Sequence, residues 1–362
     1  MPLPPLPSRL LLSFNMTTPQ DNAVQQNSQI VLSSHPSGSL TVDNFRLVEA
    51  PLAALEEGQF LIENRYLALD AGFRQWMNAG SGDNYLPAMP LGKAVQSIVL
   101  GQVVDSRHAD YPVGTTVMGR TAWEQYSIAD GSDLMTIIDA EADIPLHEYL
   151  CALGPAGMTA YFGLLDIGNP SAGETVVVSA AAGGVGAIVG QIAAIKGCRV
   201  LGITSSEDKA AWLRDELGYH GTLNYRREPG LLTQLEEQVP AGMDILFDNV
   251  GGAVLDTCMQ HLAEGARLVL CGAISQYDHT GQHEPVHNLW QLITKRARAQ
   301  GFMFSDYIDR YPDAMAEMAS WIRAGKLKSP VTISTGIEST AAAYCDMLTG
   351  KSRGKCLVRL SS

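Results

Sequence analysis

The chain has 362 residues, of which 46% are hydrophobic and 17% are charged, as in a globular protein with room for two domains. Its net charge of −13 and the lack of any basic run argue against a nucleic-acid partner, because such binding needs a clustered basic face. Every long apolar run is interrupted by glycine or polar residues, so we expect no membrane partner. The six cysteines are scattered and never spaced as Cys-x-x-Cys, which indicates reduced thiols in a cytoplasmic protein.

The first part of the chain divides into a polar stretch and a β-rich stretch. Residues 1–37 are rich in Pro, Ser, Gln and Asn without a sustained hydrophobic period, so we expect a disordered tail there. Short β-rich runs separated by Gly and Pro follow, and they predict a small β-barrel. These runs are residues 45–52, 59–70, 94–104, 111–119 and 123–128. Residues 144–165 then have a helical composition.

A strand, a glycine turn and a helix come next. Residues 174–179 form a β-branched apolar run, the turn reads SAAAGGVG, and residues 187–196 are small, apolar and helical in composition. A side chain at Gly183 or Gly186 would hold a pyrophosphate away from the backbone N–H groups, or keep the helix off the strand. With a second strand at residues 198–204, the pattern favours a dinucleotide site over a glycine-rich helix that binds no ligand.

The end of that second strand indicates which dinucleotide is bound. An NAD site needs a carboxylate there to accept hydrogen bonds from the ribose hydroxyls. This chain instead has hydroxyl side chains at residues 204–206 and Lys209 one turn later, which suits a 2′-phosphate. Glu207 and Asp208 are the counter-evidence, and their alternative interpretation is that of acids in the first turn of a helix. We therefore predict NADPH.

The second half of the chain alternates helix and strand, which predicts a doubly wound α/β domain. The expected helices are residues 207–217, 231–239, 253–262, 311–324 and 339–348. The expected strands are residues 222–225, 244–249, 267–271 and 301–306, one near Val331, and residues 355–360. The predicted fold class is therefore α/β, with a β-barrel domain beside a Rossmann domain.

Seven motifs carry a resemblance to a known family. They are GPAGMTAYFGLLDIG, SAAAGGVG, SSEDKAAWL, LNYR, FDNVGG, LCGAISQY and the terminal GKSRGKCLVRL. In their order and spacing, from about Leu40 to the end, the chain resembles the medium-chain dehydrogenase/reductase superfamily. Within it the chain is most similar to the zinc-independent prostaglandin reductases, curcumin reductases and plant alkenal double-bond reductases.

The resemblance implies a domain organisation and an assembly. A GroES-like substrate domain would comprise residues 38–155 and 326–362, with a Rossmann NADPH-binding domain at residues 156–325. Relatives commonly dimerise through the edge strand of the Rossmann sheet, which is expected at residues 301–306. We therefore expect a homodimer.

The resemblance also implies the site residues. Tyr277 would be the catalytic residue, near the reacting enone. The cofactor-binding residues would be Thr159, Gly183, Gly184, Val185, Gly186, Ser205, Lys209, Tyr225, Asn249, Cys271, Gly272, Ala273, Ile274, Ser275, Tyr277, Phe302, Met303, Phe304 and Ser352. Two positions depart from the family pattern: Gly72 replaces a tyrosine that can face the substrate, and Ser352 replaces an asparagine beside the nicotinamide.

The implied function is NADPH-dependent reduction of the C=C bond of an α,β-unsaturated ketone or aldehyde. Hydride would reach the β-carbon, Tyr277 or a ribose hydroxyl would stabilise the enolate, and a proton would reach the α-carbon. Two alternatives stay open at this point, a quinone reductase of the same superfamily and a protein that binds NADPH without catalysis.

One further pattern resembles a metal site. His279, His283 and His287 are spaced by four, which would align three ligands on a helix. Gly281 and Pro285 break such a helix, so a solvated loop over the pocket is the better interpretation. The Cys and His sets of zinc alcohol dehydrogenases are missing as well, and we expect no metal.

Overall fold

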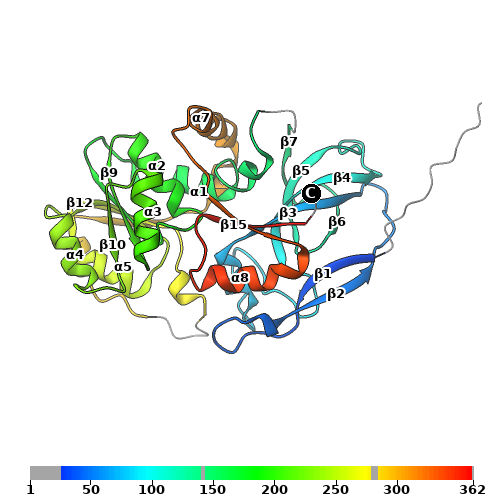
Figure 1. Ribbon diagram of the computed structural model, residues 1–362, viewed down its shortest axis with the longest axis horizontal. Coiled ribbons are helices and arrows are strands. Elements are labelled where there is room, and N and C mark those ends of the chain that lie inside the picture. The colour runs from blue at the N-terminus through cyan, green and yellow to red at the C-terminus, as the bar shows by residue number, and fades with distance from the viewer. Residues whose placement is uncertain (1–25, 140–142, 279–283, 361–362) are drawn as a thin grey trace, which may run out of the picture.

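The computed structural model describes residues 26–139, 143–278 and 284–360. The chain forms two lobes side by side, with strand β15 (Lys355–Arg359) between them (Figure 1). The Rossmann lobe lies on the left of this view and the barrel lobe on the right.

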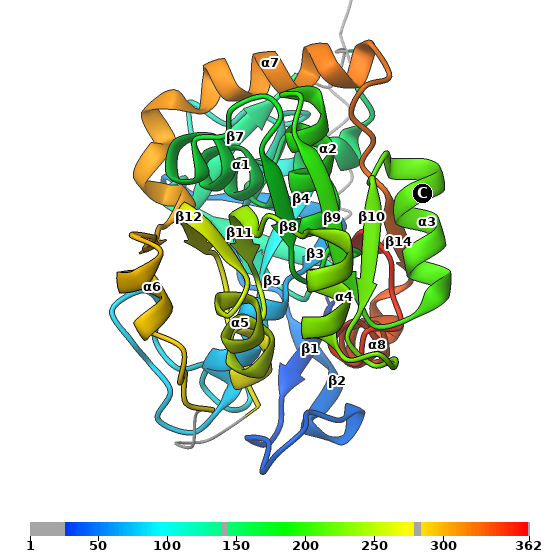
Figure 2. The ribbon, with the colours of Figure 1, turned by 90° about the vertical axis from the view of Figure 1, so that its left-hand side faces the viewer.

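Within the described residues, six parallel strands form the sheet of the Rossmann lobe, in the order β10-β9-β8-β11-β12-β13. They are β8 (Thr175–Val178), β9 (Arg199–Thr204), β10 (Gly221–Asn224), β11 (Met243–Asp248), β12 (Leu262–Leu270) and β13 (Arg298–Gly301). Figure 2 shows β12 to β10 side by side in this order. The order reverses between β8 and β11, and a ligand binds beyond the carboxyl ends of the strands at such a point.

Helices cover both faces of this sheet. They are α1 (Pro155–Phe162), η4 (Gly163–Gly168), α2 (Gly186–Ile195), α3 (Glu207–Leu217), α4 (Leu231–Gln238), α5 (Gly252–Met259), α6 (Trp290–Thr294) and α7 (Tyr311–Arg323). Val176 and Val178 pack into the core beneath α1 and α2, whereas Val177 packs into the core beneath α4 and α5. Because both faces of β8 are buried, its sequence is a continuous apolar run.

The barrel lobe contains a second sheet, in the order β14-β15-β3-β4-β5-β7, with β6 paired to β3. Its other strands are β3 (Phe60–Leu69), β4 (Gln96–Ser106), β5 (Thr116–Ala122), β6 (Tyr126–Ala129), β7 (Leu134–Ile138) and β14 (Val331–Thr335). The C-terminal segment returns here, since β15 runs antiparallel to β3. Helix α8 (Thr340–Leu348) packs beside it, and the buried hydroxyl of Tyr344 donates to the carbonyl of Asp70 at 3.1 Å. Short 3-10 turns are η1 (Val42–Asn44), η2 (Ala71–Met77), η3 (Leu146–Leu150), η5 (Ile274–Gln276), η6 (Phe304–Arg310) and η7 (Ile337–Ser339).

The expected disordered tail is wrong over its last part. Strand β1 (Gln26–Leu32) lies within it and pairs antiparallel with β2 (Phe45–Pro51) in a sheet of two strands. Ile30 and Leu32 are buried, and the backbone N–H of Ile30 donates to the carbonyl of Trp123 at 2.8 Å. This strand was not predicted from the sequence because polar residues at its start interrupt the apolar pattern. Residues 1–25 lie outside the described part of the chain.

Two other expectations about local structure are also corrected. The strand expected at residues 301–306 ends at Gly301, and η6 follows it. The pairing of β13 with β12 ends at Leu270 and Gly301, so residues 302–306 have no neighbouring strand in the described part of the chain, and Phe302 and Phe304 pack against the core of the Rossmann lobe from the turn that follows. The helical region expected at residues 144–165 consists of η3, α1 and η4, because Pro155 starts a new helix at its first turn.

Candidate cofactor and substrate site

The glycine turn between β8 and α2 is shaped by close backbone contacts. A Cβ on Gly186 would lie 2.5 Å from the carbonyl oxygen of Ala180, and one on Gly183 would lie 3.2 Å from the same oxygen. Ala180 itself has a positive φ of 47°. The turn is therefore tight, and it needs glycine at both positions.

The C-terminal segment lies against this turn. Gly354 pairs with Gly183 in an isolated parallel bridge, and its N–H donates to the carbonyl of Ala182 at 2.8 Å. A Cβ on Gly184 would lie 3.2 Å from Cδ of Lys355. The barrel lobe thus contacts the Rossmann lobe at the point where a dinucleotide pyrophosphate would bind.

Ser205 and Lys209 follow the carboxyl end of β9, as expected. The side chain of Ser206 caps α3 by accepting from the N–H of Lys209 at 3.3 Å, which fixes the helix start. The Lys209 ammonium donates to the carbonyl of Gly350 at 2.6 Å, and burial lowers the pKa of this lysine. A Cβ on Gly350 would lie 4.0 Å from the hydroxyl of Ser205, so the three residues surround one small space.

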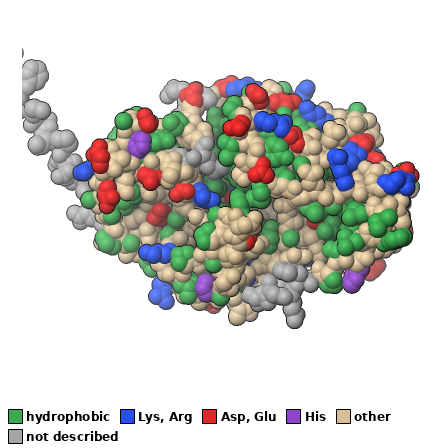
Figure 3. Space-filling view, turned by 180° about the vertical axis from the view of Figure 1, so that it is seen from behind, with side chains coloured by type: hydrophobic (Ala, Val, Ile, Leu, Met, Phe, Trp, Pro, Cys, Tyr) green, Lys and Arg blue, Asp and Glu red, His purple; other side chains and the backbone are tan. Residues whose placement is uncertain are grey.

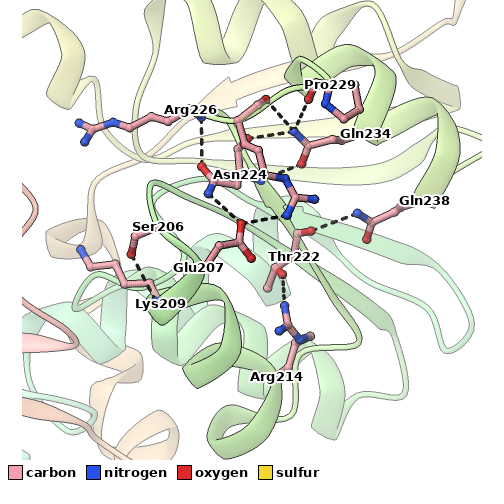
Figure 4. Close-up of polar contacts among 11 residues, drawn as sticks. Ser206, Glu207, Lys209, Arg214, Thr222, Asn224, Arg226, Pro229, Gln234 and Gln238 are labelled. Carbon is pink, nitrogen blue, oxygen red and sulfur yellow. Dashed lines mark hydrogen bonds and ion pairs between the residues drawn. The ribbon is translucent and has the colours of Figure 1, made fainter.

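The two acids that could have indicated NAD are engaged elsewhere. Glu207 accepts from the amide of Asn224 at 3.0 Å and from the guanidinium of Arg227 at 3.1 Å. The Asn224 contact is the main reason that the pKa of Glu207 is lowered. Asp208 pairs with Arg353, which lowers its pKa. Figure 4 shows the Glu207 network, and the side chains of Lys209 and Arg226 extend to the same side of it.

Sequence reasoning missed two cations beside Lys209. Arg226 lies over the ring of Tyr225, with 5.5 Å between the guanidinium carbon and the ring centroid, and Arg353 lies 5.7 Å from the ring centroid of Trp212. Both cations contribute to the lowered pKa of Lys209, which places all three positive charges near one another. Tyr225 follows β10 and is exposed. The position of Arg226 directly after Tyr225 could have indicated its place beside Lys209. No neighbouring residue in the sequence could have indicated the place of Arg353.

The loops after β8, β11 and β12 are held together by Asp248 and Asn249. The buried carboxylate of Asp248 accepts from the hydroxyl of Ser179 at 2.7 Å and from the N–H of Gly251 at 2.8 Å, and burial raises its pKa. The side-chain amide of Asn249 donates to the carbonyl of Ser179 at 2.8 Å. Asn249 therefore bridges two strand ends, as expected of a residue that caps a strand beside the cofactor.

Residues 271–277 form the next wall of the site. The N–H groups of Cys271 and Gly272 both donate to the carbonyl of Asp248, at 2.8 and 3.2 Å. Ser275 is tied to the carbonyl of Val250 through its hydroxyl at 2.7 Å. The segment also contains Ala273 and Ile274, so the structure brings this group of predicted residues together at the carboxyl ends of β11 and β12.

Tyr277 closes this segment, and its side chain folds back on it. The phenol oxygen accepts from the N–H of Ala273 at 3.2 Å. Burial raises the pKa of Tyr277 above its ordinary value of 10, although the hydrogen bond from Ala273 acts in the opposite direction. The phenol is thus neutral near pH 7, and because its oxygen is the acceptor toward Ala273, its own hydrogen is available to another partner.

These residues fit a dinucleotide that carries a 2′-phosphate. A Cβ at Gly186 would collide with the backbone of Ala180 and Ala181, so glycine there lets the helix start pack closely on the strand end, as a dinucleotide-binding turn requires. Lys209, Arg226 and Arg353 supply positive charge at the strand end where the 2′-phosphate would lie, and Glu207 and Asp208 are occupied.

Comparison with known proteins identifies the family. Residues 28–137 match the family described as the N-terminal domain of oxidoreductase, and residues 184–320 match the zinc-binding dehydrogenase family. The chain is 36% identical to the NADPH-dependent curcumin reductase of Escherichia coli, over 93% of this chain and 98% of that protein. It is 35% identical to the 2-alkenal reductase (NADP(+)-dependent) of Nicotiana tabacum, over 92% and 98%. The crystal structure of CurA from Vibrio vulnificus in complex with NADPH matches with a TM-score of 0.86 at 36% identity, over 92% of this chain and 99% of that chain.

The chain belongs to the zinc-independent branch of the medium-chain dehydrogenase/reductase superfamily. In this medium-chain reductase four of the predicted residues have internal partners. Thr159 donates to the carbonyl of Pro155 at 2.7 Å, and Ser352 forms a hydrogen bond with the thiol of Cys356. Phe302 and Phe304 pack against the hydrophobic core, with Met303 between them. These contacts give no evidence that the side chains of Thr159, Phe302, Phe304 and Ser352 face a cofactor site.

Among the residues that the structure describes, no group of three or more His, Cys, Asp or Glu side chains could hold a metal ion. His279 and His283 lie outside the described residues, and the backbone N–H of His287 donates to Asp256 at 2.6 Å. Likewise, no described helix is both long and apolar enough to span a membrane.

Proposed function

We propose that this medium-chain reductase uses NADPH to reduce the C=C bond of an α,β-unsaturated ketone or aldehyde. The observation that carries the proposal is one half-buried, neutral tyrosine, Tyr277, in the loop after β12, at the same edge of the parallel sheet as the glycine turn after β8 and Lys209 after β9. Relatives at 36% and 35% identity, the curcumin reductase and the 2-alkenal reductase, support the reaction class.

Different residues of the chain would contact different parts of NADPH. The N–H groups at Gly184 and Val185 and the start of α2 at Gly186 would hold the pyrophosphate, whereas the N–H of Gly183 closes the turn by donating to the carbonyl of Ala180 at 2.9 Å. Lys209 holds the 2′-phosphate, with Ser205, Tyr225 and Arg226 around it. Asn249 and residues 271–277 lie along the nicotinamide half.

When bound, NADPH supplies a hydride to the β-carbon of the substrate, which leaves the negative charge of an enolate on the carbonyl oxygen. The hydroxyl of Tyr277 donates a hydrogen bond to that oxygen, and it is free to do so because Ala273 binds only the acceptor side of the phenol. A proton from Tyr277 or from water then reaches the α-carbon. One hydride and one proton together complete the two-electron reduction.

The reaction class is tested with a small panel of acceptors. NADPH consumption is measured with an enone, an enal and a quinone, and the enone product obtained with nicotinamide-deuterated NADPH is analysed by mass spectrometry and NMR. We expect turnover with the enone and enal, and deuterium at the β-carbon. Turnover with the quinone alone would favour a quinone reductase, and NADPH binding without turnover on any acceptor would favour a non-catalytic role.

We also propose that two copies pair through the open edge of the Rossmann sheet. All four residues of β13 are exposed, and the neighbouring helix α6 presents Trp290 and Ile293, each 66% exposed. Figure 3 views this side of the molecule and shows hydrophobic side chains gathered on the Rossmann lobe at the right. An open edge strand beside exposed apolar side chains suits a second copy across a two-fold axis.

A cytoplasmic location is part of the same proposal. All six cysteines are free in the structure, which is consistent with a reducing compartment.

A further inference from the structure

Arg74 lies in the barrel lobe, and its contacts reach the segment of the Rossmann lobe that carries Tyr277. Its side chain, in the 3-10 turn η2, is only 1% exposed. Each of the three guanidinium nitrogens has a partner: Nε donates to Oδ1 of Asp278 at 2.8 Å, Nη1 to Oδ1 of Asn78 at 2.6 Å, and Nη2 to the carbonyl of Gly38 at 2.8 Å. A buried charge with this geometry holds its partners firmly, because losing one would leave donors unpaired.

Two of these contacts converge on the segment that carries Tyr277. Asp278 is the next residue after Tyr277, and it is the partner of the Arg74 Nε. Asn78, which Arg74 orients, donates from its amide to the carbonyl of Tyr277 at 3.2 Å. The contacts join residues about 200 positions apart in the chain and come from the opposite lobe.

Tyr277 is therefore held from two sides. The N–H of Ala273, in its own loop on the Rossmann lobe, fixes the phenol oxygen, while Arg74 and Asn78 of the barrel lobe fix the backbone around the same residue. A hydrogen-bond donor contributes to catalysis only if it is already aimed at the oxygen on which charge develops. A displacement of about 1 Å can cost such a group much of its effect.

We propose that Arg74 and Asn78 are positioning residues, which hold Tyr277 from the opposite lobe through Asp278 and the Tyr277 carbonyl. The inference rests on the proposed role of Tyr277 as the donor to the enolate. It goes beyond that role because it assigns a catalytic effect to an ion pair whose members need not touch the substrate.

The test uses Asp278, whose side chain is 43% exposed, so that its replacement does not empty the core. Turnover on one good enone at saturating NADPH is measured for Asp278→Ala in the wild-type and Tyr277→Phe backgrounds. We expect about five- to tenfold lower turnover in the wild-type background, a Michaelis constant for NADPH within about twofold, and no further loss in the Tyr277→Phe background. Asp278→Asn keeps an oxygen acceptor for Arg74 and should retain most of the turnover.

Asn78→Ala supplies a second variant, with the same expected pattern. The matched control is Asp133→Ala, which removes a surface carboxylate paired with Arg120 at 3.5 Å and should leave turnover unchanged. If Tyr277→Phe itself leaves turnover unchanged, the proposed donor role is wrong and the positioning role falls with it. If Tyr277→Phe lowers turnover but Asp278→Ala causes the same loss in both backgrounds, or none in either, only the positioning role is overturned.

Discussion

Tyr277 shows at the scale of a residue how the fold sets a side chain's chemistry. Its position after β12 follows from the family motif. A tyrosine is protonated near pH 7 even in water, and burial here raises its pKa further. Burial disfavours the phenolate and keeps the proton on the oxygen, and the Ala273 N–H leaves that proton pointing elsewhere. A neutral donor in a partly dry site is what stabilisation of an enolate requires.

Replacing Tyr277 with Phe should therefore reduce turnover while leaving NADPH affinity nearly unchanged. The ring and its packing persist but the donor is lost, and a ribose hydroxyl or water replaces it only in part. We expect turnover to fall about ten- to a hundredfold, or about 1.4–2.7 kcal/mol. Steady-state kinetics at saturating NADPH measures the loss. Unchanged turnover, with a deuteride isotope effect showing that chemistry is rate-limiting, would mean that Tyr277 only packs.

The pH dependence of turnover follows from the same residue. The protonated phenol is the active form, and its pKa is raised above 10. Deprotonation of Tyr277 should therefore not lower turnover between pH 7 and about 10, and a loss should begin only as the pH rises through the raised pKa. A pH profile of wild type against Tyr277→Phe measures this. A wild-type decrease centred near pH 8 that the variant lacks would contradict it.

Lys209 should decide the preference for NADPH over NADH. Its ammonium is a point charge at the end of β9, worth about 1.5–3 kcal/mol toward a phosphate. Lys209→Ala should raise the Michaelis constant for NADPH about tenfold or more and leave that for NADH nearly unchanged. The matched control is Lys328→Ala, which also removes a lysine bonded to a backbone carbonyl, that of Glu216 at 3.1 Å. Equal losses on both cofactors would reject the assignment.

At the scale of elements, the position of α2 against β9 depends on one glycine and one tyrosine. A Cβ on Gly190 would lie 2.0 Å from Cζ of Tyr219. Tyr219 is buried, and its hydroxyl donates to the carbonyl of Gly186 at 2.6 Å. The ring therefore fills the space that Gly190 leaves, and it supports the glycine turn from beneath.

Gly190→Ala should consequently destabilise the protein, although alanine in a helix is normally favoured by about 1 kcal/mol. Overpacking costs about 1–3 kcal/mol, and displacing Tyr219 also breaks its bond to Gly186. We expect a net loss of at least about 1 kcal/mol in the free energy of unfolding, and weaker NADPH binding. Denaturant melts measure the first. Gly230→Ala, where a Cβ would meet nothing within 4 Å, is the control, and equal stability of the two variants would refute the packing argument.

At the scale of the whole molecule, the open edge at β13 is what the proposed dimer would cover. Light scattering should give twice the chain mass at micromolar concentration. Ile293→Glu places a charge on the exposed face of α6 and should shift the mass toward the monomer, because a buried unpaired carboxylate is costly. Val113→Glu, at a residue 64% exposed in the barrel lobe, should leave the mass unchanged. A monomer in the wild type would contradict the proposal.

Features encoded by neighbouring residues were predictable from the sequence. The glycine turn, helix α3 from Glu207 to Leu217, and the strand end with Ser205 and Lys209 all rest on periodicity, capping and backbone freedom. Strand β1 was missed because its pairing with β2 and its contact with Trp123 arise from distant parts of the chain. The limits of β13 were wrong because the end of its partner β12 at Leu270, opposite Gly301, is set by the tertiary structure and not by the local sequence.

The scaffold of the site follows from local sequence patterns, whereas several contacts within the site depend on the tertiary structure. Sequence alone supplied the α/β alternation and the glycine turn, since these depend on contacts a few positions apart, whereas the resemblance to the family supplied most of the candidate site residues. It could not show that Gly350 accepts from Lys209, that Arg353 neutralises Asp208, or that Arg74 reaches Asp278. These contacts join residues more than 140 positions apart, and no local pattern encodes them, because each partner is brought into place only where the two lobes pack together.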